Sequence, residues 1–392
     1  MGVYALILGE SETVLWGLTP RQRLERQLAD LAAGQLVADL TEVPDDARVL
    51  CVRADFIYET RTLQRLLDHP DSVLYCADKP AAGSCSRSLA ETLIRGLGGE
   101  SLEAFSRIVP AELAAYEDNL RKAEEPLLLP VVHEQRRALE DRLYGRSYKG
   151  ITDLVTKWAW PRPARVVVGW CARLGITPNA VTLTGLLLVI YAGYAFYQGD
   201  YWLGLVAGWI MTFLDTVDGK LARVTIKSSR IGHVLDHGMD IIHPPFWYML
   251  WGMSLSGPIF SWSLGELYWW TFAGYIGGRL IEAAFHGLGS CSLFDWRPFD
   301  AYFRLITGRR NPCMIILTLG VAFGSPAWAF FGVVAWTVLS TGVLLLRLAQ
   351  ASAVRIANGP LTSWLADPAA AASDYPRAFR SFSRTRGAYR DE

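Results

Sequence analysis

The sequence contains little that could form a disulfide or zinc framework. Its six cysteines lie at irregular spacings without a CxxC pair, and only six histidines accompany them in 392 residues. This usage excludes a disulfide-stapled fold and favours reduced, mostly buried cysteines in a protein that faces the cytosol. Net charge is also absent, because 38 basic residues balance 38 acidic ones, and nothing in the chain indicates nucleic-acid binding.

The first ten residues, MGVYALILGE, lack the basic flank and the long apolar run of a signal peptide. They are typical of a buried first strand. Helical patterns near 19–33 and 61–68 alternate with strand patterns at 48–52 and 72–76. Such alternation predicts an α/β layer with a mostly parallel, Rossmann-type sheet, which we assign to a cytosolic domain at residues 1–130.

Apolar residues dominate the chain beyond this layer. They make up 51% of the sequence, which also holds fifteen tryptophans. Six stretches approach the ~20 residues that a bilayer requires. They lie near 180–197, 202–223, 231–254, 265–287, 312–326 and 328–350. We therefore expect an all-α, six-helix membrane domain over residues 177–356.

Basic residues predict how this domain is oriented. They are frequent at 223–230, 297–310 and beyond 355, and absent from 198–201, 254–265 and 324–326. The positive-inside rule then places both termini in the cytoplasm. The basic, aromatic linker at 131–176 predicts an amphipathic helix in the headgroup layer. The small, polar, arginine-bearing residues 357–392 predict a mobile cytoplasmic tail.

Four aspartates lie where two of these helices meet. Asp215 and Asp218 share a face of one helix, and Asp236 and Asp240 share a face of the next, because residues three or four apart are neighbours. If the two helices pack together, their carboxylates meet, and repulsion between them requires a cation. Oxygen ligands suit Mg²⁺ or Mn²⁺. Acidic residues at membrane depth are usually functional, so the cluster predicts a metal site.

A rival reading is a zinc site. It would use a set of residues that recur three and four apart: His233, Asp236, His237 and Asp240. Zinc bound there would leave the paired Asp215 and Asp218 unexplained, so the four-aspartate interpretation is favoured.

Small and basic residues complete a pattern of fixed spacing around the aspartates. The order is Asp215, two residues, Asp218-Gly219, two residues, Ala222-Arg223, eight residues, Gly232, three residues, Asp236, three residues and Asp240. This pattern resembles the complete signature of the CDP-alcohol phosphotransferases, and no position departs from it. Arg223 offers a planar fork suited to a phosphate, and the small residues let a ligand approach closely.

The resemblance implies a function for each part of the signature. Its four aspartates would bind one or two Mg²⁺ or Mn²⁺ ions, with Asp240 as the general base. Asp215, Gly219, Ala222 and Arg223 would hold the nucleotide, and Gly232 is a possible contact to the acceptor or its phosphate. Asn179 and Thr182, which open the first membrane helix, are further nucleotide candidates. Relatives are commonly dimers, so a homodimer is expected.

Other basic residues leave alternatives open. Arg279, in the fourth apolar stretch, could bind a phosphate of the acceptor or the donor, or could pair with Glu282 three residues on. Arg304, Arg309 and Arg310 lie in a loop whose positive charge satisfies the orientation rule without any substrate, and that explanation is favoured for them.

The N-terminal layer resembles a degenerate nucleotidyltransferase. Residues 17–26, GLTPRQRLER, are similar to the segment after that family's phosphate loop, and Asp55 follows a strand where the family places a metal-binding aspartate. The glycine-rich loop is missing, and Glu10 and Glu12 would repel a triphosphate. A scaffold or regulatory remnant is therefore favoured over an active domain.

We therefore expect an integral protein of the cytoplasmic membrane that transfers a substituted phosphate from a CDP-alcohol, either CDP-diacylglycerol or a CDP-polyol, to a hydroxyl acceptor. CMP would be released, in phospholipid or related phosphodiester biosynthesis. Two alternatives remain. The protein could be a bifunctional enzyme whose N-terminal domain makes the CDP-alcohol from CTP, or a non-catalytic membrane anchor.

Overall fold

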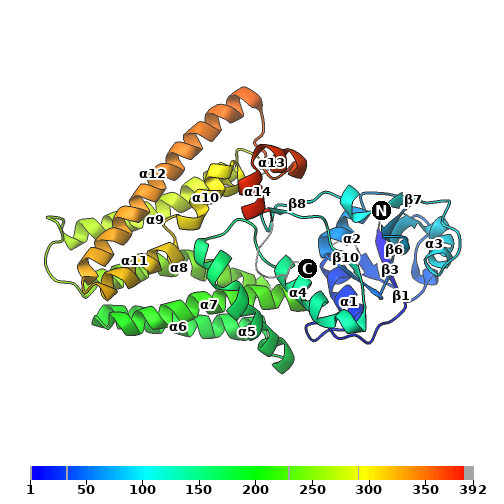
Figure 1. Cartoon of the computed structure of the whole chain (residues 1–392), viewed down its shortest axis with the longest axis horizontal. Helices are drawn as coiled ribbons and strands as arrows, with labels where there is room; N and C mark the ends of the chain where they lie inside the picture. Colours follow the sequence, from blue (N-terminus) through cyan, green and yellow to red (C-terminus); the bar gives the residue numbers. More distant parts are fainter. Residues whose placement is uncertain (1, 32–33, 228–229, 290, 384–392) are drawn as a thin grey trace. The chain divides into compact units, whose positions relative to one another are not determined.

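The computed structural model describes residues 2–31, 34–227, 230–289 and 291–383, except for the side chains of residues 30, 34 and 230–237 (Figure 1). By its contacts the chain divides into two compact units. The first comprises residues 1–117, 123–147 and 223–227, and the second comprises residues 118–122, 148–222 and 228–392. The units alternate along the sequence, so neither of them is one continuous segment.

The first unit is built on a six-stranded sheet in the order β2-β1-β3-β6-β5-β7. Its strands are β1 (Val3–Leu8), β2 (Gly34–Leu36), β3 (Arg48–Arg53), β5 (Ser72–Cys76), β6 (Lys79–Ser86) and β7 (Ser106–Ile108). β1 is parallel to β2 and β3, and β5 is parallel to β7. β6 runs antiparallel to both of its neighbours, β3 and β5. The predicted α/β layer is confirmed, but the mostly parallel, Rossmann-type arrangement is not, because β6 in the middle of the sheet is antiparallel to both neighbours.

The reversed strand β6 follows from a tight turn. Only Ala77 and Asp78 separate the paired residues Cys76 and Lys79, and Ala77 has a φ of 52°. So short a connection permits only an antiparallel neighbour, since a parallel crossover needs about a dozen residues or more. The turn contains none of the Gly or Asn residues that signal a hairpin, and no reversal was predicted there.

Helices and short strands complete the first unit. They are α1 (Pro20–Asp30), α2 (Thr60–Leu66), α3 (Ala90–Leu97), α4 (Arg136–Arg146), β4 (Phe56–Tyr58) and β10 (Leu128–Pro130), with β8 (Tyr116–Glu117) and β9 (Lys122–Ala123) near the unit boundary. α1 begins where Thr19 caps it, because its hydroxyl accepts from the Gln22 amide at 3.2 Å. Leu24 and Leu28 then face the sheet, in a core that includes Leu50 and Leu74.

The second unit is helical. A π-helical turn (Val155–Ala159) leads into α5 (Pro161–Leu174), α6 (Pro178–Gln198), α7 (Tyr201–Thr225), α8 (Arg230–Met253), α9 (Leu264–His286), α10 (Pro298–Ile306), α11 (Arg310–Ala322), α12 (Pro326–Asn358), α13 (Pro368–Asp374) and α14 (Pro376–Phe382). Its core gathers large apolar side chains from several helices, including Phe196, Trp247, Trp251 and Phe330, which are all buried.

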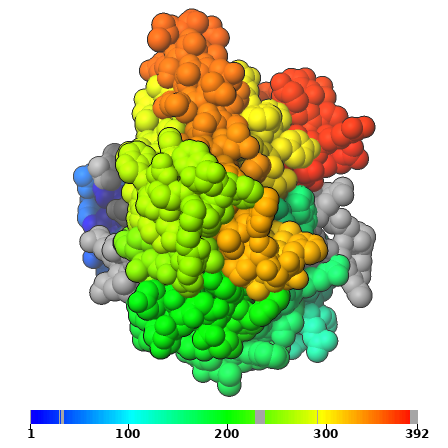
Figure 2. All heavy atoms as spheres, turned by 90° about the vertical axis from the view of Figure 1, so that its left-hand side faces the viewer, coloured from blue at the N-terminus to red at the C-terminus, as the bar shows by residue number. Residues whose placement is uncertain are grey.

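Six of these helices, α6 to α9, α11 and α12, coincide with the six predicted apolar stretches. Two of them, α6 and α12, are long and apolar enough to cross a membrane, among the residues that the structure describes. α11 is shorter, with 13 residues. Figure 2 shows the α6–α7, α8–α9 and α11–α12 connections on one face of this unit. The number of membrane crossings and their direction stay predictions.

The residues after α12 differ from the expected mobile tail. In the described part, the chain after α12 is packed into the second unit, with Leu365 and Phe382 fully buried. The ring of Phe382 contacts Tyr302 in a T-shaped arrangement with centroids 4.9 Å apart. Residues 384–392 lie outside the described residues.

A buried ion pair fastens α10 to α12. Arg347 donates to both carboxylate oxygens of Asp300, at 2.6 and 2.8 Å, and Asp300 is fully buried. We expect Arg347→Ala to lower the free energy of unfolding by about 3 kcal/mol, because it leaves a buried carboxylate without its partner. Chemical unfolding of the purified protein in detergent measures this, with Arg355→Ala on the same helix as control. Equal stability losses in both variants would contradict the prediction.

Candidate active site

Two aspartates of the signature meet at one guanidinium group. Arg310, the first residue of α11, contacts Asp215 of α7 at 2.5 Å and Asp240 of α8 at 2.6 Å. Its side chain is only 12% exposed, against 18% for Asp215 and 41% for Asp240. The predicted meeting of carboxylates from the two helices is therefore observed for Asp215 and Asp240. The positive group between them is the guanidinium of Arg310.

Asp218 lies one turn after Asp215 on α7, and it is buried. It accepts a hydrogen bond from the Thr182 hydroxyl of α6 at 2.7 Å. That hydroxyl also contacts the carbonyl oxygen of Pro178 at 3.1 Å. Thr182 therefore lies directly beside Asp218, whereas Asn179 is exposed one turn earlier on α6, and the nucleotide-binding role of both residues stays a prediction.

The other signature residues are placed less closely. Gly219 and Ala222 are half-buried on α7 beyond Asp218. Arg223 is exposed and belongs to the first unit, where it donates to the carbonyl oxygen of Ser147 at 3.3 Å. Gly232 and Asp236, like His233 and His237 of the zinc alternative, fall within residues 230–237, outside the described side chains.

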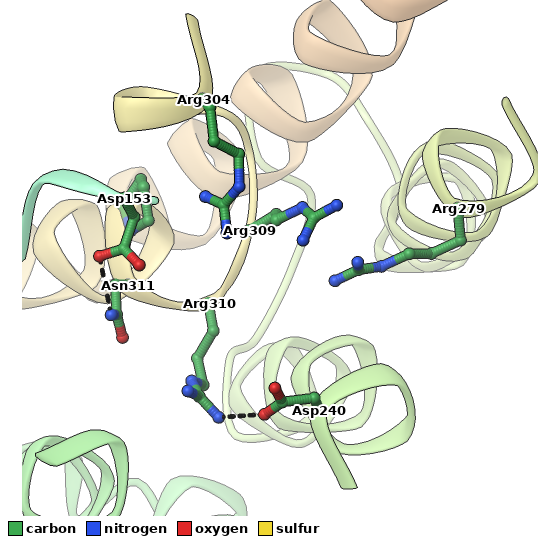
Figure 3. Close-up of a pocket in the computed structure, with 8 residues that line it drawn as sticks. Asp153, Asp240, Arg279, Arg304, Arg309, Arg310 and Asn311 are labelled. Atoms are coloured by element: carbon green, nitrogen blue, oxygen red, sulfur yellow. Dashed lines mark hydrogen bonds and ion pairs between the residues drawn. The ribbon is translucent and has the colours of Figure 1, made fainter. Parts of the chain in front are cut away.

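Next to Asp240 lies a small pocket that we call the arginine pocket, which opens to solvent. It is lined by Asp153, Asp240, Arg279, Arg304, Arg309, Arg310, Asn311 and Pro312. Figure 3 shows Arg279, Arg304 and Arg309 extending toward the same space from different elements. Arg304, Arg309 and Arg310, which were attributed to membrane orientation, are thus brought together with the signature.

The guanidinium groups of the arginine pocket are only partly neutralised. Glu282 pairs with both Arg309 and Arg279. Arg304 is half-buried, and its Nε and one terminal nitrogen are buried with no hydrogen-bond partner within the described part of the chain. Burial and the neighbouring charge of Arg309 lower the pKa of Arg304 to about 9. An anion in the pocket would reverse that shift, so the pocket favours a negatively charged ligand.

Of the alternatives left open for Arg279, the structure shows the pairing with Glu282, and phosphate binding stays a prediction. Arg279 pairs with Glu282 at 3.7 Å and also lines the arginine pocket. One terminal nitrogen donates to the Tyr275 hydroxyl at 3.1 Å, and that hydroxyl donates to the backbone carbonyl of Asp240 at 3.0 Å. Arg279 is therefore connected to the signature helix through a single tyrosine.

Asp153 and Asn311 are site residues that the sequence analysis missed. Asn311 donates to the Asp153 carboxylate at 2.9 Å, and the Thr156 amide donates to it at 3.0 Å. Burial alone would raise the pKa of Asp153, but the charge of Arg304 and these hydrogen bonds bring it below its usual value. Asp153 is therefore an ionised residue in the wall of the pocket. A lone aspartate in a basic linker carried no signal of this role.

The donor chemistry of the site fits a hard divalent cation. Asp215 and Asp240 already converge on one positive group, and all the available donors are carboxylate oxygens. Among the described side chains, no group of three or more Asp, Glu, His or Cys residues lies close enough to hold a metal. A complete ligand set would need Asp236, which lies outside that part.

The expected metal-binding aspartate of the first unit is engaged by a neighbour. Arg53 donates to both oxygens of Asp55, at 2.6 and 3.0 Å, and its guanidinium also reaches the carbonyl oxygen of Leu97. The hydrogen bonds to Asp55 raise the pKa of Arg53. Trp16, in the loop between β1 and α1, is buried, and its indole nitrogen donates a hydrogen bond to the backbone carbonyl oxygen of Glu140.

Comparison with known proteins places the signature in a family. Residues 175–285 match the family model described as CDP-alcohol phosphatidyltransferase. The archaetidylinositol phosphate synthase of Pyrococcus horikoshii is 36% identical over 112 residues, which cover 28% of this chain and 54% of that protein. Cholinephosphotransferase 1 of Xenopus laevis is 30% identical over 154 residues, covering 36% of this chain and 35% of that protein. The chain thus spans about half or less of the length of these relatives.

A solved structure of Mycobacterium tuberculosis phosphatidylinositol phosphate synthase, in complex with manganese and citrate, aligns with a TM-score of 0.34 and 21% identity. The alignment covers 47% of this chain and 87% of that one. The sequence matches lie in the helical region and leave the N-terminal α/β unit unassigned. Residues 175–285, in the C-terminal region of this protein, are thus similar to the CDP-alcohol phosphatidyltransferase family.

Proposed function

We propose that this protein is an integral membrane transferase. It moves a substituted phosphate group from a CDP-alcohol, either CDP-diacylglycerol or a CDP-polyol, to a hydroxyl acceptor and releases CMP. The observation that carries the proposal is the position of Asp240. This residue ends the family signature and contacts the guanidinium group of Arg310, as Asp215 does. It also lines the arginine pocket.

The nucleotide and its metal would lie on the α7 side of Asp240. Asp215, Asp218, Asp236 and Asp240 would hold one or two Mg²⁺ or Mn²⁺ ions, which neutralise the diphosphate and stabilise the leaving CMP when bound. Gly219 and Ala222 leave room for the nucleotide beside these carboxylates. Arg223, Asn179 and Thr182 are proposed as further nucleotide contacts, and Thr182 also fixes Asp218 through its hydrogen bond.

The reaction is a substitution at phosphorus. The acceptor oxygen bonds to the phosphorus that carries the donor's alcohol, and the bond from that phosphorus to the CMP oxygen breaks. The acceptor's proton passes to Asp240, which acts as the general base. Asp240 suits this role because it belongs to the signature and also lines the arginine pocket, where the two substrates would meet.

The arginine pocket supports an acceptor that itself carries a phosphate. Planar guanidinium groups bind phosphate oxygens in pairs, and Arg304 has nitrogens without hydrogen-bond partners in the described structure. The name of the archaeal relative describes a phosphate-bearing product, whereas that of the frog relative does not. The pocket favours the first chemistry. Gly232, near the start of α8, stays a possible contact to this substrate.

A membrane location is supported by the helices of the second unit. α6 and α12 meet the length and hydropathy of a spanning helix, and α12 exposes Leu339, Leu345 and Leu346. α5 buries Ala164 and Val168 on one face, while Trp170 and Leu174 are more than half exposed. Such a helix suits the headgroup layer of the cytoplasmic membrane. We propose cytoplasmic termini from the charge pattern, and a homodimer from the family resemblance.

Release of CMP from the purified protein tests this proposal. CDP-diacylglycerol or CDP-polyols are supplied with Mn²⁺ or Mg²⁺, and acceptors are offered in pairs, such as inositol against inositol 1-phosphate and glycerol against glycerol 3-phosphate. We expect metal-dependent release that a chelator abolishes, with a preference of about tenfold or more for one phosphorylated acceptor. No release with any pair would support the non-catalytic anchor instead.

The first unit is proposed as a scaffold or regulatory domain. Because Arg53 holds both oxygens of Asp55, that carboxylate is not positioned to ligate a metal–triphosphate complex. Formation of a CDP-alcohol from CTP, lost in Asp55→Ala, would support the bifunctional alternative.

A further inference from the structure

Arg310 lies between the two halves of the candidate active site. One terminal nitrogen contacts the Asp240 carboxylate at 2.6 Å, and the other contacts the Asp215 carboxylate at 2.5 Å. The same side chain lines the arginine pocket. Its Nε is buried and has no hydrogen-bond partner within the described residues. Arg310 thus uses both terminal nitrogens to neutralise carboxylates of the family signature.

These carboxylates have two competing uses. Close carboxylates repel each other unless a positive group separates them, and the guanidinium of Arg310 performs this task. A divalent cation would need the same oxygens, at distances near 2 to 2.5 Å that leave no room for a guanidinium between them. The higher charge of the cation favours its replacing the arginine. The freed guanidinium would then face the arginine pocket, whose wall it already forms.

We propose that Arg310 is an internal counter-cation of Asp215 and Asp240, which a divalent ion displaces toward the arginine pocket. Metal loading would then complete the anion site, so that the acceptor's phosphate is bound best after the metal. This inference rests on the proposed metal-dependent function. Arg310 is a positioning residue in this scheme, because it acts through the carboxylates and the acceptor site.

Arg309 provides a matched control. It is the preceding residue and lines the same pocket, but it pairs with Glu282 and not with the signature aspartates. Replacement of either arginine removes one positive charge from the same region. Only replacement of Arg310 removes the competitor for the metal-binding oxygens.

A Mn²⁺-binding measurement on the full-length protein in detergent tests the proposal. The electron paramagnetic resonance signal of the free ion reports how much Mn²⁺ is bound. We expect the Kd for Mn²⁺ to fall by about five- to tenfold in Arg310→Gln, the usual size of coupling between sites. It should change less than about twofold in Arg309→Gln, whose partner is Glu282. An Arg310→Gln protein that binds Mn²⁺ no more tightly than wild type would overturn the proposal.

Two further measurements keep the test decisive. If Arg310→Gln fails to fold, Arg310→Lys serves in its place, because a lysine cannot bridge both carboxylates and should still tighten Mn²⁺ binding. Sulfate is then used as a probe of the arginine pocket. The Arg310 substitution should weaken sulfate binding severalfold more when Mn²⁺ is bound than when a chelator has removed it. An equal effect in both conditions would show that Arg310 does not move, and would overturn the displacement.

Failure of this inference can be told apart from failure of the proposed function. A wild-type protein that binds no Mn²⁺ would remove the metal-dependent transferase itself. If the wild-type protein binds Mn²⁺ and Arg310→Gln binds it equally well, only the counter-cation role of Arg310 is excluded.

Discussion

Asp240→Asn should lower the rate of CMP release by at least about 10³-fold, the upper range for loss of a general base. The substitution removes the proposed proton acceptor and one charged oxygen of the proposed metal site, while the side chain keeps its size. It also leaves Arg310 with Asp215 as its remaining signature partner. The rate is measured as CMP released from the CDP-alcohol donor and phosphorylated acceptor that wild-type protein uses best.

A matched substitution separates chemistry from folding in this experiment. Asp200→Asn makes the same change at an exposed aspartate just before α7, at the end opposite the signature. It should release CMP at close to the wild-type rate. Both variants should also retain the wild-type circular dichroism spectrum and unfolding midpoint. Near-normal release by Asp240→Asn would exclude Asp240 as the general base.

Arg304→Gln is expected to raise the KM for the phosphorylated acceptor by about 10- to 100-fold, as is typical when a charge-assisted hydrogen bond is lost. The KM for the CDP-alcohol should change little, because Arg304 lines the arginine pocket, which we propose for the acceptor. Initial rates at varied acceptor concentration, with donor saturating, separate KM from kcat.

Arg297→Gln is the control for this second prediction. Arg297 immediately precedes α10, which carries Arg304, but its side chain is exposed and lies over the Trp296 ring. Its replacement should leave both KM values within about twofold of wild type, as for surface substitutions generally. Equal effects of the two substitutions, or a rise in donor KM with Arg304→Gln, would contradict the assignment of the arginine pocket to the acceptor.

The meeting of Asp215 and Asp240 could be predicted because it depends on local spacing. Residues three or four apart share a helix face, and two neighbouring helices joined by a short turn bring their faces together. The first strand, the helix after it and the strand ending at Arg53 were equally legible, since each has its own apolar pattern. These features are encoded within about 30 residues of sequence, the length of one supersecondary unit.

The arginine pocket could not be predicted in the same way. Arg304 and Arg309 are far from Asp240 in the sequence, and a basic loop between apolar helices has a sufficient explanation in membrane orientation alone. Asp153 lies in a linker with no pattern around it. Only tertiary packing brings these residues together. The packing of Leu365 and Phe382 was missed for a related reason, because isolated apolar residues in a polar tail produce no periodic signal.

The alternation of the two units along the chain restricts how the protein can be divided. A cut after residue 147 would give an N-terminal fragment without residues 223–227, and a C-terminal fragment without residues 118–122. Each fragment would thus lose part of its own folding unit. Exchange of the α/β unit between homologues by a single junction should therefore produce poorly folded chimaeras, and evolution would have to acquire or discard this unit in several coordinated steps.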